Sequence, residues 1–268
     1  MSLLTVLSTV SSSVQGRTST RSAGMTALTS YPCRTVVRGV AAGLALAVIG
    51  LSSMAPDASA AAGSDRLSPG DSLSGGASIV SGADRLVMQT DGNLVLYAGP
   101  GVALWASGTN NHPGSVAVMQ GDGNLVVYAP GNVSVWGSGT NGRGASTLLL
   151  QSDGNLVLRG PGGVTWSTDT YKQSMAVNRF PVYGWGADQW GPLRSLWTRE
   201  SNWNTTAKNP SSGAYGIPQA LPASKMAVDG ADYLTNPATQ IHWGEDYIAG
   251  RYGTPANAWN HEVRYGWY

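Results

Sequence analysis

The nonapeptide QTDGNLVLY at 89–97 recurs as QGDGNLVVY at 120–128 and as QSDGNLVLR at 151–159. The copies begin at 89, 120 and 151, a period of 31 residues, and each is followed by a tryptophan, at Trp105, Trp136 and Trp166. A fixed period of this size is typical of a repeat architecture, in which each unit buries its apolar face against its neighbours.

The aliphatic residues within each copy alternate at period two, which indicates strands rather than helices. In the first copy, Leu94 and Leu96 would face away from Val95 and Tyr97. The simplest closed arrangement is three sheets around a pseudo-threefold axis, with the three tryptophans in a shared core. Residues 61–172 are therefore predicted to form an all-β domain.

The polar positions of the repeat have an explanation that needs no ligand. Asp-Gly stands in the middle of all three copies, and this pair between strand residues is a common hairpin signal. A turn accounts for Asp91, Gly92 and Asn93. It does not account for a Gln before the turn and a Val-x-Tyr after it at the same offsets, so a binding role stands beside the turn as an alternative.

The pattern Q-x-D-x-N-x-V-x-Y resembles the signature of the bulb-type mannose-binding lectins. The resemblance implies a β-prism II fold in which the Gln, Asp, Asn and Tyr side chains hydrogen-bond mannose hydroxyls and the Val methyls touch the sugar ring. A sugar hydroxyl both donates and accepts, so a carboxylate, amides and a phenol suit it. The candidate carbohydrate-binding residues are Gln89, Asp91, Asn93, Val95 and Tyr97; Gln120, Asp122, Asn124, Val126 and Tyr128; and Gln151, Asp153, Asn155 and Val157.

The third copy departs from the pattern, because Arg159 stands where the others have Tyr97 and Tyr128. We therefore expect two mannose sites per chain. The alternatives for the third copy are that the arginine donates in place of the phenol, or that this copy is purely structural.

A second stretch, LWTRESNWNTTAKNPSSGAYGIPQ at 196–219, places one acid, Glu200, among apolar residues. Trp190, Leu193, Trp197 and Glu200 follow one another at the spacing of one helix face. Partial burial there would disfavour the charged carboxylate and raise its pKa, as a general acid requires. The alternative is a solvated glutamate at the rim of an amphipathic helix.

The Glu-Ser pair that ends this helix, the following A-x-N-P and the segment SSGAYGIPQ resemble the soluble lytic transglycosylase-like branch of the lysozyme superfamily, which cleaves peptidoglycan. The resemblance implies a mainly α, lysozyme-like domain over 187–268. It makes Glu200 the single catalytic acid and base and places Ser212, Tyr215 and Gln219 along the glycan cleft. Where larger members carry a Tyr-Asn-Ala-Gly segment, this chain has WNHE at 259–262.

Local signals place the helices of this second domain. Asp188 is predicted to cap the helix that carries Glu200. Two further helices are predicted over about 236–251 and about 254–264, each opening on Asn-Pro or Thr-Pro. Residues 173–186 break the repeat and contain a proline and two glycines, so they are predicted to be a linker.

Residues 1–60 are predicted to be a secretory signal peptide, because arginines precede the apolar run at 39–51 and an Ala-Ser-Ala cleavage site follows at 58–60. The run is shorter than the roughly 20 residues of a transmembrane helix, and Met25 is an alternative start. Cys33 is the only cysteine and precedes the run, so the mature chain would have no disulfide.

The composition limits the partners. Charged residues make up 12% of the chain, against about 25% in typical globular proteins. Lys and Arg total 16 and Asp and Glu total 15, with no basic run, which argues against nucleic acid as a partner. His242 and His261 lack metal-ligand spacing with other candidate ligands, so neither a metal nor another cofactor is expected.

These observations predict a secreted, extracellular protein, free or associated with a cell wall, with no membrane contact after signal removal. Its first domain would hold mannose-type glycans and its second would cleave peptidoglycan through Glu200. Two alternatives are a sugar-binding protein with a catalytically inactive second domain, and a pair of wall-attached structural modules. Turnover of purified peptidoglycan separates them. The sequence specifies neither the natural glycan nor the oligomeric state.

Overall fold

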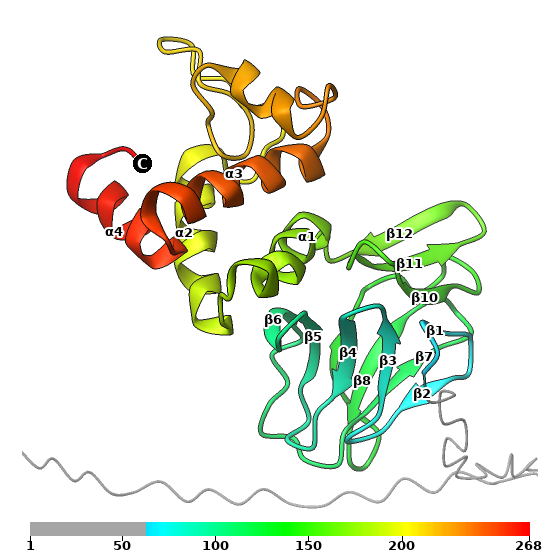
Figure 1. Cartoon of the computed structure of the whole chain (residues 1–268). Coiled ribbons are helices and arrows are strands. Elements are labelled where there is room, and N and C mark those ends of the chain that lie inside the picture. The colour runs from blue at the N-terminus through cyan, green and yellow to red at the C-terminus, as the bar shows by residue number, and fades with distance from the viewer. Residues whose placement is uncertain (1–62) are drawn as a thin grey trace, which may run out of the picture. The chain divides into compact units, whose positions relative to one another are not determined.

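The computed structural model describes residues 63–268, and the signal peptide predicted at 1–60 lies outside them. A β-region comes first in the described chain and a mainly helical region follows it (Figure 1). Within residues 63–268, no helix combines the length and the apolar character needed to cross a membrane.

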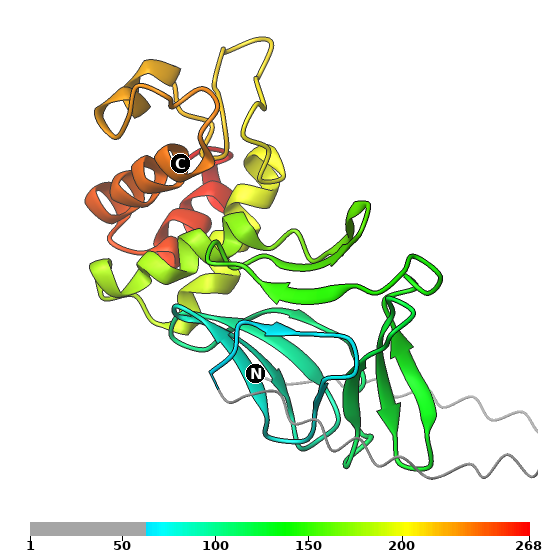
Figure 2. The ribbon, with the colours of Figure 1, turned by 90° about the vertical axis from the view of Figure 1, so that its right-hand side faces the viewer.

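The β-region consists of three four-stranded antiparallel sheets, which confirms the predicted β-prism. Each repeat supplies three consecutive strands of one sheet, and the strands surround one interior (Figure 2). The strands are β1 (Arg66–Leu67), β2 (Ser72–Leu73), β3 (Ser78–Ser81), β4 (Asp84–Met88), β5 (Leu94–Ala98), β6 (Val102–Ala106), β7 (Val116–Met119), β8 (Leu125–Ala129), β9 (Val133–Gly137), β10 (Thr147–Leu150), β11 (Leu156–Gly160) and β12 (Gly163–Ser167).

The fourth strand of every sheet comes from the segment that precedes the repeats. Strand β1 pairs with β10, β2 with β7 and β3 with β4, so three short strands that follow one another in the chain complete three different sheets. Each of them places one aliphatic side chain, Leu67, Leu73 or Ile79, fully buried in the common core. This segment therefore links the three sheets in addition to the repeats themselves.

The three repeated tryptophans meet at the centre of the prism, as the period predicts. Trp105, Trp136 and Trp166 contact one another edge to face, with ring centroids 5.4, 5.6 and 6.0 Å apart, within the range that aromatic pairs prefer. The rings are half-buried and pack against a fully buried aliphatic cluster. Inward-facing leucines of every repeat, rather than the tryptophans alone, thus form the core.

The turn inside each repeat has three residues instead of the two that Asp-Gly suggests. In the first copy the Gly92 N–H donates to Gln89 O at 3.1 Å, and the Gln89 N–H donates to Asn93 O at 2.8 Å. Gly92 has φ +94°, which makes this a type I turn followed by a glycine bulge. A Cβ on Gly92 would lie 2.1 Å from His112 O, so no larger residue fits there.

Each turn is covered by the segment that follows the repeat. A backbone carbonyl of the next connection lies against Gly92 and against Gly123. The corresponding Gly154 of the third copy is covered by Ser174 and by Asp84 of the first repeat. The covering segment after the third repeat is therefore a helix of the C-terminal region, which packs back onto the first repeat.

The helical region contains α1 to α4 and three 3-10 turns. Helix α1 contacts both α3 and the hairpin of β5 and β6, so the segment predicted as a linker at 173–186 is largely helical and packed. The elements are α1 (Tyr171–Arg179), η1 (Phe180–Tyr183), η2 (Ala187–Gln189), α2 (Trp190–Ser201), η3 (Ala223–Val228), α3 (Pro237–Tyr252) and α4 (Pro255–Tyr265).

The start signals of α3 and α4 act as expected. The side chain of Asn236 accepts from the Ala238 N–H, and that of Thr254 accepts from the Asn257 N–H. The prediction for Asp188 is wrong, because the 3-10 turn η2 runs directly into α2 and places Asp188 inside that turn. Gln189 occupies the N-cap position, with no side-chain cap.

Candidate functional site

The first two repeats hold the predicted Gln and Tyr side chains together. Gln89 Nε2 donates to the Tyr97 hydroxyl at 2.8 Å, and Gln120 Nε2 donates to the Tyr128 hydroxyl at the same distance. Alternate side chains of a strand share one face of the sheet. Tyr97 therefore lies on the same face of β5 as Val95, and Tyr128 on the same face of β8 as Val126. Each of these two copies therefore holds a hydrogen-bonded Gln–Tyr pair.

The Asn and Asp of the motif also hold the fold. Asn93 Oδ1 accepts from Ser107 Oγ at 3.1 Å and from the Thr109 N–H at 3.1 Å, and Asp91 Oδ1 accepts from the Asn93 N–H at 2.9 Å. The same set recurs around Asn124 and, with a threonine in place of the serine, around Asn155. These bonds hold the turn and the segment that follows each tryptophan, so the fold alone gives the Asn and Asp residues a role without a ligand.

Several polar atoms remain for a ligand after these bonds. Three groups make no hydrogen bond with residues 63–268: Asp91 Oδ2 as an acceptor, and Asn93 Nδ2 and the Tyr97 hydroxyl as donors. They supply one acceptor and two donors, which is the mixture that sugar hydroxyls require. Val95 is only 3% exposed, so it offers a sugar little more than an edge.

The third repeat keeps the turn and loses the pair. Asn155 N–H donates to Asp153 Oδ1 at 2.9 Å, as in the other copies. Gln151 and Val157 stand at the same motif positions as in the other copies, and Val157 is 2% exposed. Arg159 on β11 is exposed and offers no phenol oxygen to the Gln151 amide, so the Gln–Tyr pair of the first two copies is absent here.

Glu200 stands one residue before the end of α2, on the face that the spacing predicts. Leu193 and Trp197 of the same face are fully buried, whereas Glu200 is half-buried. The helix ends at Asn202, which adopts the left-handed conformation. The chain therefore turns away just after the acid and leaves one side of the carboxyl open.

Burial, and to a smaller extent the negative charge of Glu262, raises the pKa of Glu200 to about 7, while Arg199 opposes the shift. Glu262 comes from α4, is 3% exposed, and accepts from Arg199 Nε at 2.9 Å. This acid belongs to the WNHE segment at 259–262. Glu262 thus affects the pKa of Glu200 through its charge, and it is not among the residues that line the cleft beside Glu200.

A cleft of about 480 Å³ opens beside Glu200. Ser212 and Gln219 line it, as the resemblance implies, whereas Tyr215 does not, because its hydroxyl donates to Leu234 O at 2.9 Å on another side of the loop. The full lining is Glu200, Asn209, Ser212, Ala214, Gln219, Leu221, Gly266, Trp267 and Tyr268.

Two aromatic residues of the cleft, Trp267 and Tyr268, belong to no motif that the sequence analysis identified. Trp267 is 50% exposed at the cleft. Tyr268 is held by two bonds: its hydroxyl accepts from Trp197 Nε1 at 3.0 Å and donates to Pro218 O at 2.9 Å. Burial, together with the nearby Glu200, raises the pKa of this phenol. Both follow Gly266, the C-cap of α4, and only the tertiary fold brings them to the acid.

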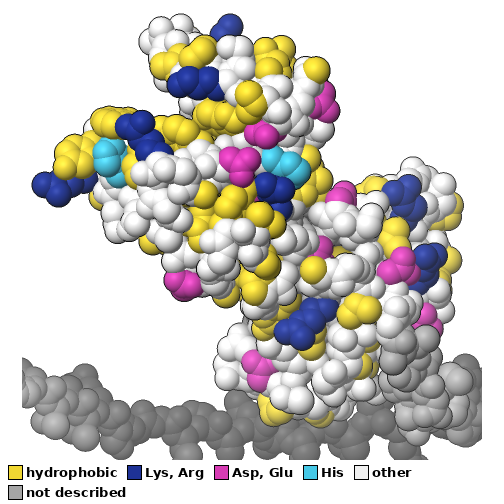
Figure 3. Space-filling view, viewed as in Figure 1, with side chains coloured by type: hydrophobic (Ala, Val, Ile, Leu, Met, Phe, Trp, Pro, Cys, Tyr) yellow, Lys and Arg dark blue, Asp and Glu magenta, His cyan; other side chains and the backbone are white. Residues whose placement is uncertain are grey.

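Charges of both signs are sparse and interspersed on the face seen in Figure 3. Within the described residues, no three His, Cys, Asp or Glu side chains gather closely enough to hold a metal ion.

Residues 188–265 match the family model of the transglycosylase SLT domain. One similar solved structure is a monomeric monocot mannose-binding lectin from Gastrodia elata, with 42% identity over 40% of this chain and 98% of that chain, and a TM-score of 0.38. Another is the mannose-specific agglutinin from snowdrop (Galanthus nivalis) bulbs, complexed with methyl-α-D-mannoside, with 38% identity over 40% and 96% of the two chains and a TM-score of 0.35. Among curated proteins, no match was found.

Proposed function

Because the chain joins a bulb-type lectin domain of the β-prism fold to an SLT transglycosylase domain, we propose that it holds mannose-containing glycans with the first domain and cleaves peptidoglycan with the second. The proposed cleavage is non-hydrolytic and uses Glu200 as both acid and base. The chain is thus a carbohydrate-binding protein of the lytic transglycosylase type, and its glycan, its product and its catalytic residue are the proposals.

The cleft supports a single-acid mechanism. Glu200 is the one acidic side chain among the described residues that line it, and its pKa of about 7 keeps a large protonated fraction at neutral pH. Hydrolytic glycosidases generally use two carboxyls, about 5 to 5.5 Å or about 6.5 to 9.5 Å apart, on either side of the bond. Glu262 is buried against Arg199, so it does not flank a sugar in this cleft.

The proposed reaction balances without water. Glu200 gives its proton to the glycosidic oxygen between N-acetylmuramic acid and N-acetylglucosamine, and the C1–O bond breaks. The Glu200 carboxylate then takes the proton of the muramoyl C6 hydroxyl as that oxygen bonds to C1. The products are a free 4-hydroxyl and a 1,6-anhydromuramoyl end, and Glu200 is protonated again.

The lectin domain supports attachment through repeated weak contacts. Each neutral hydrogen bond contributes only about 0.5 to 1.5 kcal/mol, so one mannose site binds weakly. Several sites on one body raise the avidity by about 10² to 10⁴ when the glycan presents repeated sugars. We propose that this attachment places the second domain at a glycan-rich surface, and that the chain is secreted through the signal peptide predicted at 1–60.

The alternative, a catalytically inactive second domain, predicts no special protonation for Glu200. Glu200 lines the cleft and burial raises its pKa to about 7, and this combination of position and protonation supports the enzyme.

Digestion of purified peptidoglycan, followed by mass spectrometry, tests the proposal. Wild-type protein is expected to release 1,6-anhydromuramoyl products, and Glu200→Gln, which keeps the shape and cannot donate as an acid, is expected to release none. Products heavier by one water would show hydrolysis instead. Undiminished cleavage by the variant would remove Glu200 from the mechanism, and no cleavage by the wild type would leave the binding-module alternative.

A further inference from the structure

A small pocket lies beside the Glu200 cleft and shares three lining residues with it, Gln219, Leu221 and Tyr268. Its volume is about 100 Å³, against about 480 Å³ for the cleft. One water needs roughly 10 to 15 Å³ on such a scale, so the pocket has room for a side group of several heavy atoms beside a glycan in the cleft. Its remaining lining is Pro218, Ala220, Lys225, Trp243 and Tyr247.

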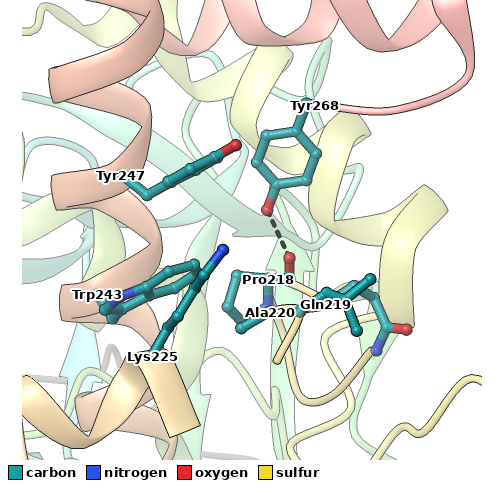
Figure 4. Close-up of a pocket in the computed structure, with 8 residues that line it drawn as sticks. Pro218, Gln219, Ala220, Lys225, Trp243, Tyr247 and Tyr268 are labelled. Atoms are coloured by element: carbon teal, nitrogen blue, oxygen red, sulfur yellow. Dashed lines mark hydrogen bonds between the residues drawn. The ribbon is translucent and has the colours of Figure 1, made fainter. Parts of the chain in front are cut away.

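Two stacked rings form one wall of the pocket. Trp243 and Tyr247 lie one turn apart on α3, with ring centroids 5.3 Å apart and planes 14° from parallel. Tyr268 stands opposite them and is fixed by its bond to Pro218 O at 2.9 Å (Figure 4). The walls are thus aromatic, and Tyr268 lines both the pocket and the cleft.

Lys225 is the one charged side chain of this lining. It comes from η3, and Figure 4 shows its ammonium group pointing toward the space between Tyr247 and Pro218. No carboxylate of residues 63–268 forms an ion pair with it. An ammonium group without an acidic partner, at the mouth of an aromatic pocket, suits a ligand that carries a carboxylate on a short apolar stem.

We propose that this pocket binds a carboxylate carried by the O3 substituent of a muramoyl residue. The inference rests on the proposed function, because it needs a muramoyl glycan in the Glu200 cleft. Such a residue carries a lactyl group, whose carboxyl is either free or extended by a peptide with carboxylates of its own. Lys225 pairs with the carboxylate and the rings cover the stem. The enzyme thereby distinguishes muramoyl glycans from glycans of N-acetylglucosamine alone.

The test measures binding in the full chain carrying Glu200→Gln, which holds glycans without cutting them. Calorimetry compares three ligands: peptide-free muramoyl strands, peptide-bearing strands and N-acetylglucosamine oligomers. Lys225→Gln is expected to weaken binding of carboxylate-bearing strands about tenfold, the size of one charge-assisted hydrogen bond, and to leave the oligomers unchanged. Arg264→Gln, which removes an exposed positive charge at the end of α4, is the matched control and is expected to change nothing.

A loss on peptide-free strands identifies the lactyl carboxylate, and a loss on peptide-bearing strands alone identifies a peptide carboxylate. Equal weakening for all three ligands, or no weakening for any, overturns the inference. The proposed function fails separately, by the absence of cleavage in the wild type, so the two failures are distinguishable.

Discussion

Ser174 Oγ on α1 donates a 2.7 Å hydrogen bond to Asp84 Oδ2 on the first strand of the first repeat. Asn178 Nδ2 donates to the other oxygen of the same carboxylate at 3.2 Å. In the second and third repeats the position of Asp84 is a serine, Ser115 or Ser146, that binds the preceding connection. Helix α1 therefore does for the third repeat what the connections between repeats do for the first two, and it closes the ring.

We expect Asp84→Ala to lower the free energy of unfolding by about 1 to 3 kcal/mol, because the fully buried Ser174 hydroxyl would lose its acceptor. Asp84→Asn, which keeps an acceptor for Ser174, is the control and is expected to lose much less. Urea unfolding followed by tryptophan fluorescence measures both. Equal stability of the alanine variant and the wild type would contradict a closing role for this contact.

The same carboxyl predicts a dependence on pH. Burial raises the pKa of Asp84 above its ordinary value of 3.8, so the folded state binds this proton more tightly than the unfolded state. The stabilisation is complete below the unfolded pKa and is lost as the pH rises through the folded pKa. The free energy of unfolding of the wild type minus that of Asp84→Asn, measured by urea unfolding from pH 3 to 7, is expected to fall as the pH rises. A difference that rises with pH would show the opposite shift.

Mannan binding tests whether the repeated motif binds sugar or only forms hairpin turns. Asp91→Asn together with Asp122→Asn keeps the side-chain oxygen that accepts from the backbone of the turn and removes the carboxylate. We expect immobilised mannan to retain the wild-type chain and to release most of this variant at an unchanged melting temperature. Asp153→Asn in the third copy is the matched control. Full retention of the double variant would leave the Asp-Gly pairs as turns only.

The stoichiometry for mannose follows from Arg159. Gln89 and Gln120 each bind a phenol, and Gln151 has none to bind, so calorimetric titration is expected to give two sites per chain. Arg159→Tyr supplies the missing phenol and is expected to add the third. Three equal sites in the wild type would show that the arginine serves as well as the tyrosine.

The rate of peptidoglycan cleavage is expected to fall as the pH rises through about 7, because the proton of Glu200 is needed and its pKa is about 7. Glu262→Gln removes a negative charge that helps to raise this pKa, so the alkaline limb of the profile is expected to move to lower pH. Rates from pH 5 to 9 for both proteins decide this. An unmoved limb, in a variant that still folds, would show that burial alone sets the pKa.

The repeats made the β-region predictable, because period, strand alternation and turn residues are all local patterns. The helix faces around Glu200 and the starts at Asn236 and Thr254 were readable for the same reason. The role of Glu262 was not, since its burial against Arg199 arises only when α4 packs on α2. Trp267 reaches the cleft through the return of the chain after α4, which no spacing encodes.

The strand exchange at the start of the β-region sets the order in which this molecule can fold. Arg66 of β1 pairs with Leu149 of β10, so β1, the first strand of residues 63–268, has no strand partner until the third repeat has been made. Pairings of such long sequence separation slow folding, and a chain cut short after the second repeat would carry an unpaired strand, an open route to aggregation. Completion of the β-region is thus a late event that waits for nearly the whole repeat sequence.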